Sequence, residues 1–166
     1  MRDEVVEVLI KSKNNGKMIA LKIGMIILCI LAVLSAITLF GSIAFIVAVI
    51  AGGIAFWANG RTKIEYEYTY FQKELQVDII YNQENRKPVA TYDLSKMEAC
   101  VKVKSDKMGE YERRQLVTKD YSSKKSENES HVYAIIYDGS TKILFEPNEK
   151  LLKSINYDFP RKVFEY

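Results

Sequence analysis

The chain contains one long stretch, residues 23–58, without a single charged side chain. As one straight α-helix these residues would rise about 54 Å at about 1.5 Å each, whereas the hydrocarbon core of a bilayer is about 30 Å thick. Divided near residues 40–42, the stretch provides two helices, each long enough to cross a bilayer. The sequence therefore predicts a transmembrane helical hairpin with helices at about residues 19–39 and 42–58.

The residues that flank this stretch predict its orientation. Lys17 and Lys22 lie on the N-terminal side, Arg61 and Lys63 follow the second helix, and the tip of the hairpin carries no charge. Cationic flanks stay on the cytoplasmic side of a membrane, and Trp57 lies where an interfacial aromatic side chain is expected. We therefore expect a multi-pass protein of the cell membrane with both termini cytoplasmic. We refer to these five residues as the membrane flank.

Small residues recur every four positions in both predicted helices. They are Ala32 and Ala36 in the first helix and Ala44, Ala48 and Gly52 in the second. Such stripes let two helix backbones approach closely, so we expect them to pack the hairpin, with homo-oligomerisation as the alternative. Neither helix has an ionisable residue near its middle, which a transport pathway usually needs.

The hairpin divides the chain into three parts. Residues 1–17 form a short amphipathic segment, residues 18–60 the transmembrane hairpin, and residues 61–166 one cytoplasmic domain. Residues 3–10 place apolar side chains on one helical face, which predicts a short interfacial helix, with a frayed extension as the alternative. Residues 61–166 contain 19 Lys and Arg against 18 Asp and Glu, so no nucleic-acid partner is expected.

After the membrane segment, the periodicity changes to the alternation of β-strands. Residues 64–70 and 75–81 predict a hairpin, and residues 122–130 predict an exposed connection. Further strand-like segments lie at residues 89–92, 97–103, 116–118, 131–137 and 141–145, and a helix is expected at about residues 148–157. The predicted fold class is thus an α+β membrane protein, in which an antiparallel β domain of about seven strands and a C-terminal helix follow the hairpin.

Particular strings of the sequence resemble a known family. They are VVEVLIKSKNNGK before the hairpin, IEYEYTY and ELQVDII after it, and FEPNEKLLKSI near the end. These strings are similar to those of small uncharacterised membrane proteins of Gram-positive bacteria, which have a two-helix hairpin and a C-terminal β domain of unknown function. The strand order resembles a pleckstrin-homology-like (PH-like) domain, although a generic antiparallel α+β sheet with one covering helix fits it too. The resemblance implies no site and no activity.

Few residues offer catalytic chemistry. Glu65, Glu67 and Asp78 can face one another across the first β-hairpin, either as an acid/base pair or as cross-strand partners of lysines. His131 is the single histidine and opens a strand near several serines, but no nucleophile motif surrounds it. We therefore predict no catalytic residue, no metal site and no cofactor, and do not expect an enzyme.

Three tyrosines form the most distinctive surface candidate. Tyr66, Tyr68 and Tyr70 alternate along one strand and therefore share one face. Aromatic side chains of this kind are enriched at recognition surfaces, but they also favour the half-buried positions of a sheet. We consider this face a candidate interaction surface, with core packing as the alternative.

These features predict a non-enzymatic binding module, anchored in the bilayer, that presents its β domain at the cytoplasmic membrane face to a protein or lipid partner. The first alternative is an accessory subunit of a transporter or envelope complex, assembled through the hairpin helices. The second alternative is a small membrane enzyme of unknown reaction.

Overall fold

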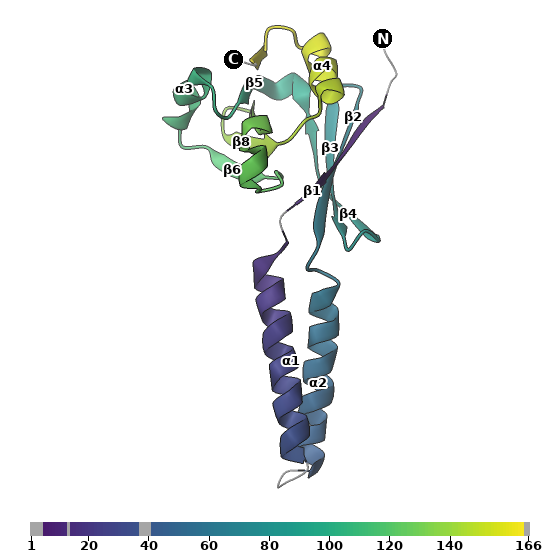
Figure 1. The fold of residues 1–166 in the computed structure, drawn as a ribbon. Helices are drawn as coiled ribbons and strands as arrows, with labels where there is room; N and C mark the ends of the chain where they lie inside the picture. The colour runs from purple at the N-terminus through teal and green to yellow at the C-terminus, as the bar shows by residue number, and fades with distance from the viewer. Residues whose placement is uncertain (1–4, 13, 37–40, 165–166) are drawn as a thin grey trace. The chain divides into compact units, whose positions relative to one another are not determined.

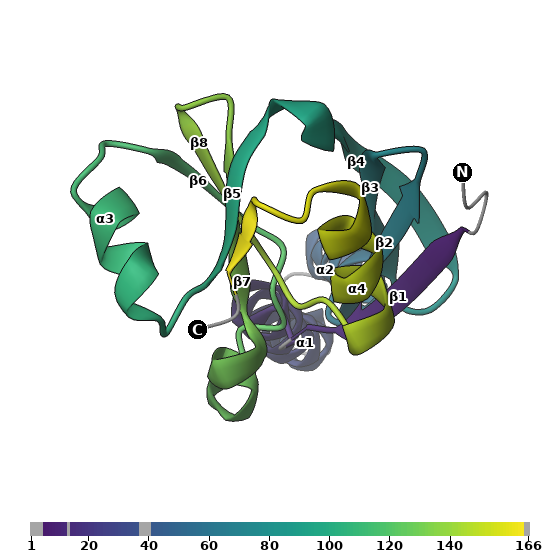
Figure 2. The ribbon, with the colours of Figure 1, turned by 90° about the horizontal axis from the view of Figure 1, so that it is seen from above.

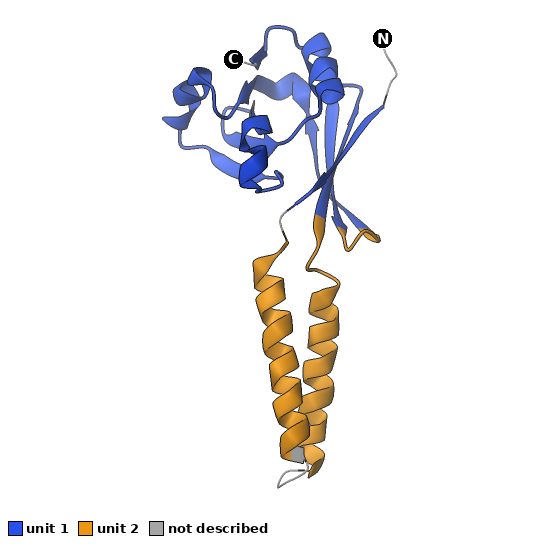
Figure 3. Ribbon diagram, viewed as in Figure 1, with its two compact units in different colours: residues 1–13, 65–80, 86–166 blue, residues 14–64, 81–85 orange. Residues whose placement is uncertain are grey.

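The structure is a computed structural model that describes residues 5–12, 14–36 and 41–164 (Figure 1). It divides into two compact units, coloured separately in Figure 3. Unit 1 comprises residues 1–13, 65–80 and 86–166 and contains the β domain, whereas unit 2 comprises residues 14–64 and 81–85 and contains the two apolar helices.

Unit 2 is built from helix α1 (Gly16–Ala36) and helix α2 (Gly41–Asn59), which lie side by side (Figure 1). The side chain of Asn15 caps α1 by accepting a hydrogen bond from the backbone N–H of Met18 (3.4 Å). Both helices are long enough and apolar enough to cross a membrane.

The two helices pack through small residues. The buried residues of α2 recur with the spacing of a coiled-coil seam and are all alanines: Ala44, Ala48, Ala51, Ala55 and Ala58. On α1, Ala32 is buried too. Gly52 does not pack in this seam, because a Cβ atom added there would meet no heavy atom within 4 Å. The side chain of Ala36 lies outside the described residues.

One four-stranded sheet contains β1 (Val6–Lys11), β2 (Ile64–Phe71), β3 (Glu74–Tyr81) and β4 (Asn85–Asp93), in the order β1-β2-β3-β4. β1 pairs antiparallel with β2, in a register that runs from Val6 opposite Tyr70 to Lys11 opposite Glu65. Chain order therefore inserts both apolar helices between two neighbouring strands of one sheet.

β1 corrects the helix predicted at residues 3–10. In a segment this short, the apolar residues fit either structure. Val5, Val8 and Leu9 would share one face of a helix, whereas Val6, Val8 and Ile10 share one face of a strand. The pairing with β2 decides between them, since it places Val6, Val8 and Ile10 opposite Tyr70, Tyr68 and Tyr66. Val6 and Val8 are consequently buried.

The second sheet contains β5 (Met97–Lys102), β6 (Val117–Asp120), β7 (Tyr133–Tyr137), β8 (Thr141–Phe145) and β9 (Val163–Phe164), in the order β6-β8-β7-β5-β9. β7 pairs antiparallel with β5 and β8, whereas β6 and β9 add in parallel at the edges. Over the described ranges the chain thus has nine strands rather than about seven, because β1 and the two-residue β9 join the sheets.

Helix α4 (Glu149–Asp158) packs against β1 and lies beside the first sheet in Figure 2. Asn148 caps it by accepting a hydrogen bond from the N–H of Leu151 (2.8 Å). Its buried residues are Leu151, Leu152 and Ile155. The helix thereby supplies part of the core of unit 1, as its amphipathic sequence predicts.

The short helices of unit 1 are η1 (Leu94–Lys96), η2 (Asp106–Met108), α3 (Gly109–Glu112) and η3 (Ser126–His131). The segment that contains η2 and α3 covers one face of the second sheet, where Met108 packs with Ala99, Val101, Ala134 and Ile136. The fold as a whole is α+β, with two apolar helices and mainly antiparallel sheets.

Candidate functional site

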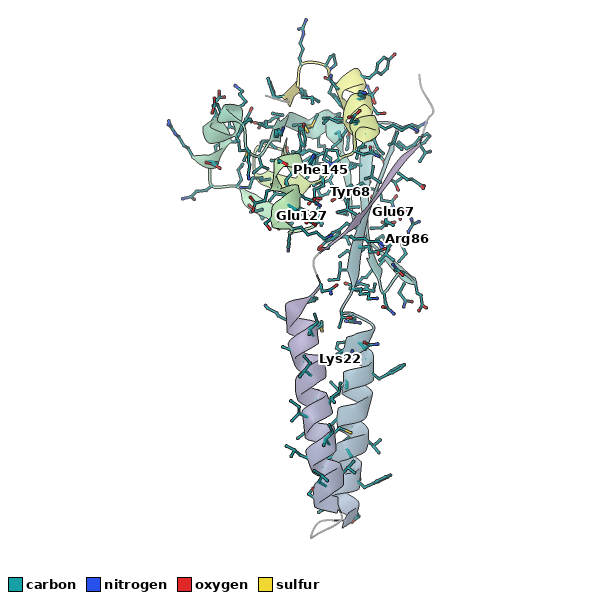
Figure 4. The ribbon with its side chains drawn as sticks, in the orientation of Figure 1. Lys22, Glu67, Tyr68, Arg86, Glu127 and Phe145 are labelled. Atoms are coloured by element: carbon teal, nitrogen blue, oxygen red, sulfur yellow. The ribbon has the colours of Figure 1, made fainter. Side chains whose placement is uncertain are left out.

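The three tyrosines of β2 are buried rather than exposed. Tyr66, Tyr68 and Tyr70 have exposed fractions of 8%, 0% and 3%. Tyr68 packs edge-on against Phe145, with 5.9 Å between ring centroids, and both side chains are labelled in Figure 4. The interaction surface predicted at these tyrosines is therefore wrong, and their face belongs to the core.

Tyr68 also satisfies two polar groups inside the core. Its hydroxyl donates a hydrogen bond to the carbonyl of Tyr121 (2.6 Å) and accepts one from the backbone N–H of Glu146 (3.4 Å). Burial raises the pKa of Tyr68 well above its ordinary value, because the charged phenolate would lose its hydration. Tyr68 is thus a neutral structural residue at neutral pH.

A second buried polar contact fixes the segment after β6. The carboxylate of Glu146 accepts hydrogen bonds from the N–H of Ser123 (2.6 Å) and from Nδ2 of Asn128 (3.3 Å). Ser122 and Ser123 are buried, which corrects the first two residues of the exposed connection predicted at residues 122–130; residues 124, 126, 127, 129 and 130 are exposed as predicted. The periodicity of the sequence could not reveal this contact, since its partners are distant in the chain.

Two of the three carboxylates predicted to face one another, Glu67 and Asp78, share a cation, which is an arginine rather than a lysine. Arg86 forms ion pairs with Glu67 and with Asp78, and the second has 3.5 Å between Nε and Oδ2 (Figure 4 labels Glu67 and Arg86). Gln76 donates a further hydrogen bond to Asp78 (3.0 Å). Asp78 and Glu65 are buried. The cluster is therefore a partly buried ion-pair network on β2, β3 and β4.

His131 lies at the end of η3 in an exposed position. Its Nδ1 is 3.2 Å from Oγ of Ser130, its neighbour in sequence. The hydroxyl of Ser122, a second serine considered near it, donates instead to Asp120 (2.7 Å). The structure thus links His131 to one adjacent hydroxyl only among these serines.

The membrane flank lies at the ends of the two helices in unit 2. Nζ of Lys22 donates a hydrogen bond to Oδ1 of Asn59 (2.8 Å), the last residue of α2; Lys22 is labelled in Figure 4. The guanidinium of Arg61 lies over the ring of Trp57, 4.2 Å from its centroid, and 5.9 Å from that of Tyr81. These contacts join both helix ends and hold two cations in defined positions.

Sequence comparison identifies one matching family. The model of the family described as bacterial PH-like domain (DUF6106) matches residues 2–165. The match includes β1, both apolar helices and the β domain, so it extends over nearly the whole chain. No curated protein and no solved structure matches the chain.

Proposed function

Because the chain belongs to the family of bacterial PH-like domains (DUF6106), we propose that it is a membrane-anchored, non-enzymatic binding module. Its helices cross the bilayer twice, both termini are cytoplasmic, and the β domain binds a protein partner at the cytoplasmic face. The single observation that carries this proposal is the insertion of the apolar helix pair between β1 and β2.

The surface of the helix pair supports the anchoring. Large apolar side chains point away from the alanine seam, and Leu34, Phe45 and Phe56 have exposed fractions of 58%, 66% and 83%. In water such a surface would be unfavourable by about 25 cal/mol for each Å² of apolar area, whereas lipid chains cover it without cost. Insertion into a bilayer would remove this cost for both helices.

The strand edges support a protein partner. β4 contains Pro88 and Lys87, which typically prevent pairing at an edge, and β6 and β9 are short. β1 has six residues, no proline and an exposed Leu9, and β2 is its single neighbour among the described strands. We therefore propose that an extended segment of the partner pairs with β1.

Labelling from outside the cell tests the anchoring. In a Cys29→Ala background, Ser42→Cys near the hairpin tip should react with a membrane-impermeant maleimide in intact cells. Glu127→Cys in the β domain should react only after lysis. Labelling of Glu127→Cys in intact cells would place the β domain outside and contradict the proposal.

Photo-crosslinking in cells tests the binding surface. A photoreactive amino acid at Leu9 should capture one defined protein, whereas the same group at Tyr157, which is exposed on α4, should not. Capture from Tyr157 but not from Leu9 would show that β1 is not the recognition strand.

The accessory-subunit function is a second candidate. Gly24 of α1 and Gly53 of α2 are exposed, and a Cβ atom at either would meet no heavy atom within 4 Å. Glycines with open space let another helix approach closely. If the hairpin assembles with other membrane helices or with a second copy, Gly53→Leu should disrupt co-purification, whereas Ile54→Leu should not.

A further inference from the structure

The cations of the membrane flank have no carboxylate partner within the described part of the chain. Unit 2 contains four cationic residues, Lys17, Lys22, Arg61 and Lys63, against one carboxylate, Glu84. None of the four forms an ion pair with a carboxylate in that part of the structure. No carboxylate of the described residues therefore balances their charge at ion-pair distance.

Unit 1 provides an internal comparison, because many of its exposed cations do have carboxylate partners. Lys104 pairs with Glu129 (3.0 Å), and Arg114 pairs with Glu98 (2.8 Å). The other cations paired in this way are Arg86, Lys107, Lys124, Lys125 and Lys153. Within the described residues, unit 2 differs from unit 1 in that none of its four cations has a carboxylate partner.

Arg61 is held in a position suited to an anion. Its guanidinium lies over the Trp57 ring, and this contact uses the flat face of the group and leaves its N–H edges available. Arg61 is exposed; in the described part of unit 2 it contacts the two aromatic rings, and its backbone N–H donates a hydrogen bond to the carbonyl of Ala58. The planar edge of a guanidinium matches two oxygens of one phosphate group.

Lys22 is held at the level where α2 ends. One proton of its ammonium is donated to Asn59, which leaves two further donors. From Lys22 towards the C-terminal end of α1, the exposed residues are apolar; they include Ile23, Ile26 and Ile27. The cationic side chains of Lys22 and Arg61 therefore lie directly next to an apolar surface.

We propose that the membrane flank binds the phosphate groups of anionic phospholipids, with Arg61 as the principal ligand. This inference rests on the proposed membrane anchoring. A zwitterionic phospholipid has its own ammonium group, which leaves the excess charge of the flank unbalanced. An anionic headgroup such as phosphatidylglycerol supplies a phosphate without a cation and balances the charge.

Trp57 is the single tryptophan of the chain and contacts Arg61, so its fluorescence reports on this site. The full-length protein is reconstituted into vesicles that mix phosphatidylcholine with phosphatidylglycerol, and one lipid at a time carries brominated acyl chains, which quench tryptophan. Brominated phosphatidylglycerol should quench wild-type Trp57 more strongly than its share of the lipid predicts. Arg61→Gln should lower this preference about fivefold, the value expected for one cation near an anionic surface.

Arg114→Gln is the matched control, because it removes an exposed arginine that already has a carboxylate partner. This variant should retain the wild-type preference. Equal quenching of the wild type by both brominated lipids, or an unchanged preference in Arg61→Gln, would overturn the proposal while leaving the anchoring intact. If neither lipid quenches Trp57, then the anchoring fails as well.

A final experiment distinguishes binding of a lipid phosphate group from binding of free inorganic phosphate. Inorganic phosphate, added to the protein in vesicles of phosphatidylcholine alone, should leave Trp57 emission unchanged. A saturable change with inorganic phosphate that is absent in Arg61→Gln would overturn the lipid assignment, because it would identify a soluble phosphate ligand.

Discussion

Lys11 lies opposite Glu65 in the register of β1 and β2, although both apolar helices separate these residues in the chain. Each helix is thus joined by a short connection to one of two strands that pair with each other. The helix pair is therefore an insertion into the β domain rather than a terminal anchor.

Loss of the Tyr68 hydroxyl should destabilise the β domain. Tyr68→Phe leaves the carbonyl of Tyr121 and the N–H of Glu146 without their buried partner, which should cost about 2 kcal/mol. Urea unfolding of the full chain in mild detergent, followed by near-ultraviolet circular dichroism, measures this loss. Tyr157→Phe, at an exposed position, should change the free energy of unfolding by less than about 0.5 kcal/mol.

Alkaline pH should destabilise the β domain, because three of its tyrosines have a raised pKa in the folded state. Burial raises the pKa of Tyr68, Tyr70 and Tyr92, and the hydrogen bond to Asp158 adds to the effect at Tyr70. In the unfolded chain these phenols ionise near pH 10. Their contribution is therefore complete below about pH 10 and is lost as pH rises above it.

Unfolding midpoints measured from about pH 8 to about pH 12 test this dependence, because this range brackets the ionisation of free phenols near pH 10. Tyr70→Phe should show a shallower loss of stability than the wild type, because one coupled ionisation is removed. An equal alkaline slope in both proteins would show that the buried tyrosines do not cause the loss.

Removal of the Arg86 charge should destabilise the ion-pair network. Arg86→Gln leaves buried Asp78 and mostly buried Glu67 without their cation. Because the Arg86 side chain is itself 53% exposed, we expect a loss of about 2 kcal/mol, less than for a fully buried pair. Arg114→Gln removes an exposed pair and should cost no more than about 1 kcal/mol, so urea midpoints of the two variants should differ.

Glu146 should control the order of the segment after β6. Glu146→Gln replaces one carboxylate oxygen by an NH2 group, so one of the two hydrogen bonds that Glu146 accepts from Ser123 and Asn128 loses its acceptor. Hydrogen exchange of the amides of residues 122–128 should accelerate about tenfold, as for a loss of about 1.4 kcal/mol. Glu127→Gln, in the same segment but exposed, should leave these rates unchanged. Equal acceleration in both variants would contradict a special role of Glu146.

The residues of the membrane flank could be selected from the sequence because their signals are local. Cations and one tryptophan lie at the ends of an uncharged stretch, where a membrane flank is expected. The contact of Lys22 with Asn59 could not be predicted, because it depends on how α1 and α2 pack. Likewise, Arg86 and Glu146 carry no pattern that distinguishes them from other charged residues.

Local sequence patterns were sufficient to predict the elements whose signals are contained in one segment: the two apolar helices, the alternating strands after them and the amphipathic α4. Contacts between distant segments, by contrast, make residues 6–11 a strand, bury the tyrosine face of β2 and bury Ser123 beside Glu146. The physical reason is the same in each case. A short alternating segment takes the structure that its partner offers, and burial depends on which distant segments cover a face.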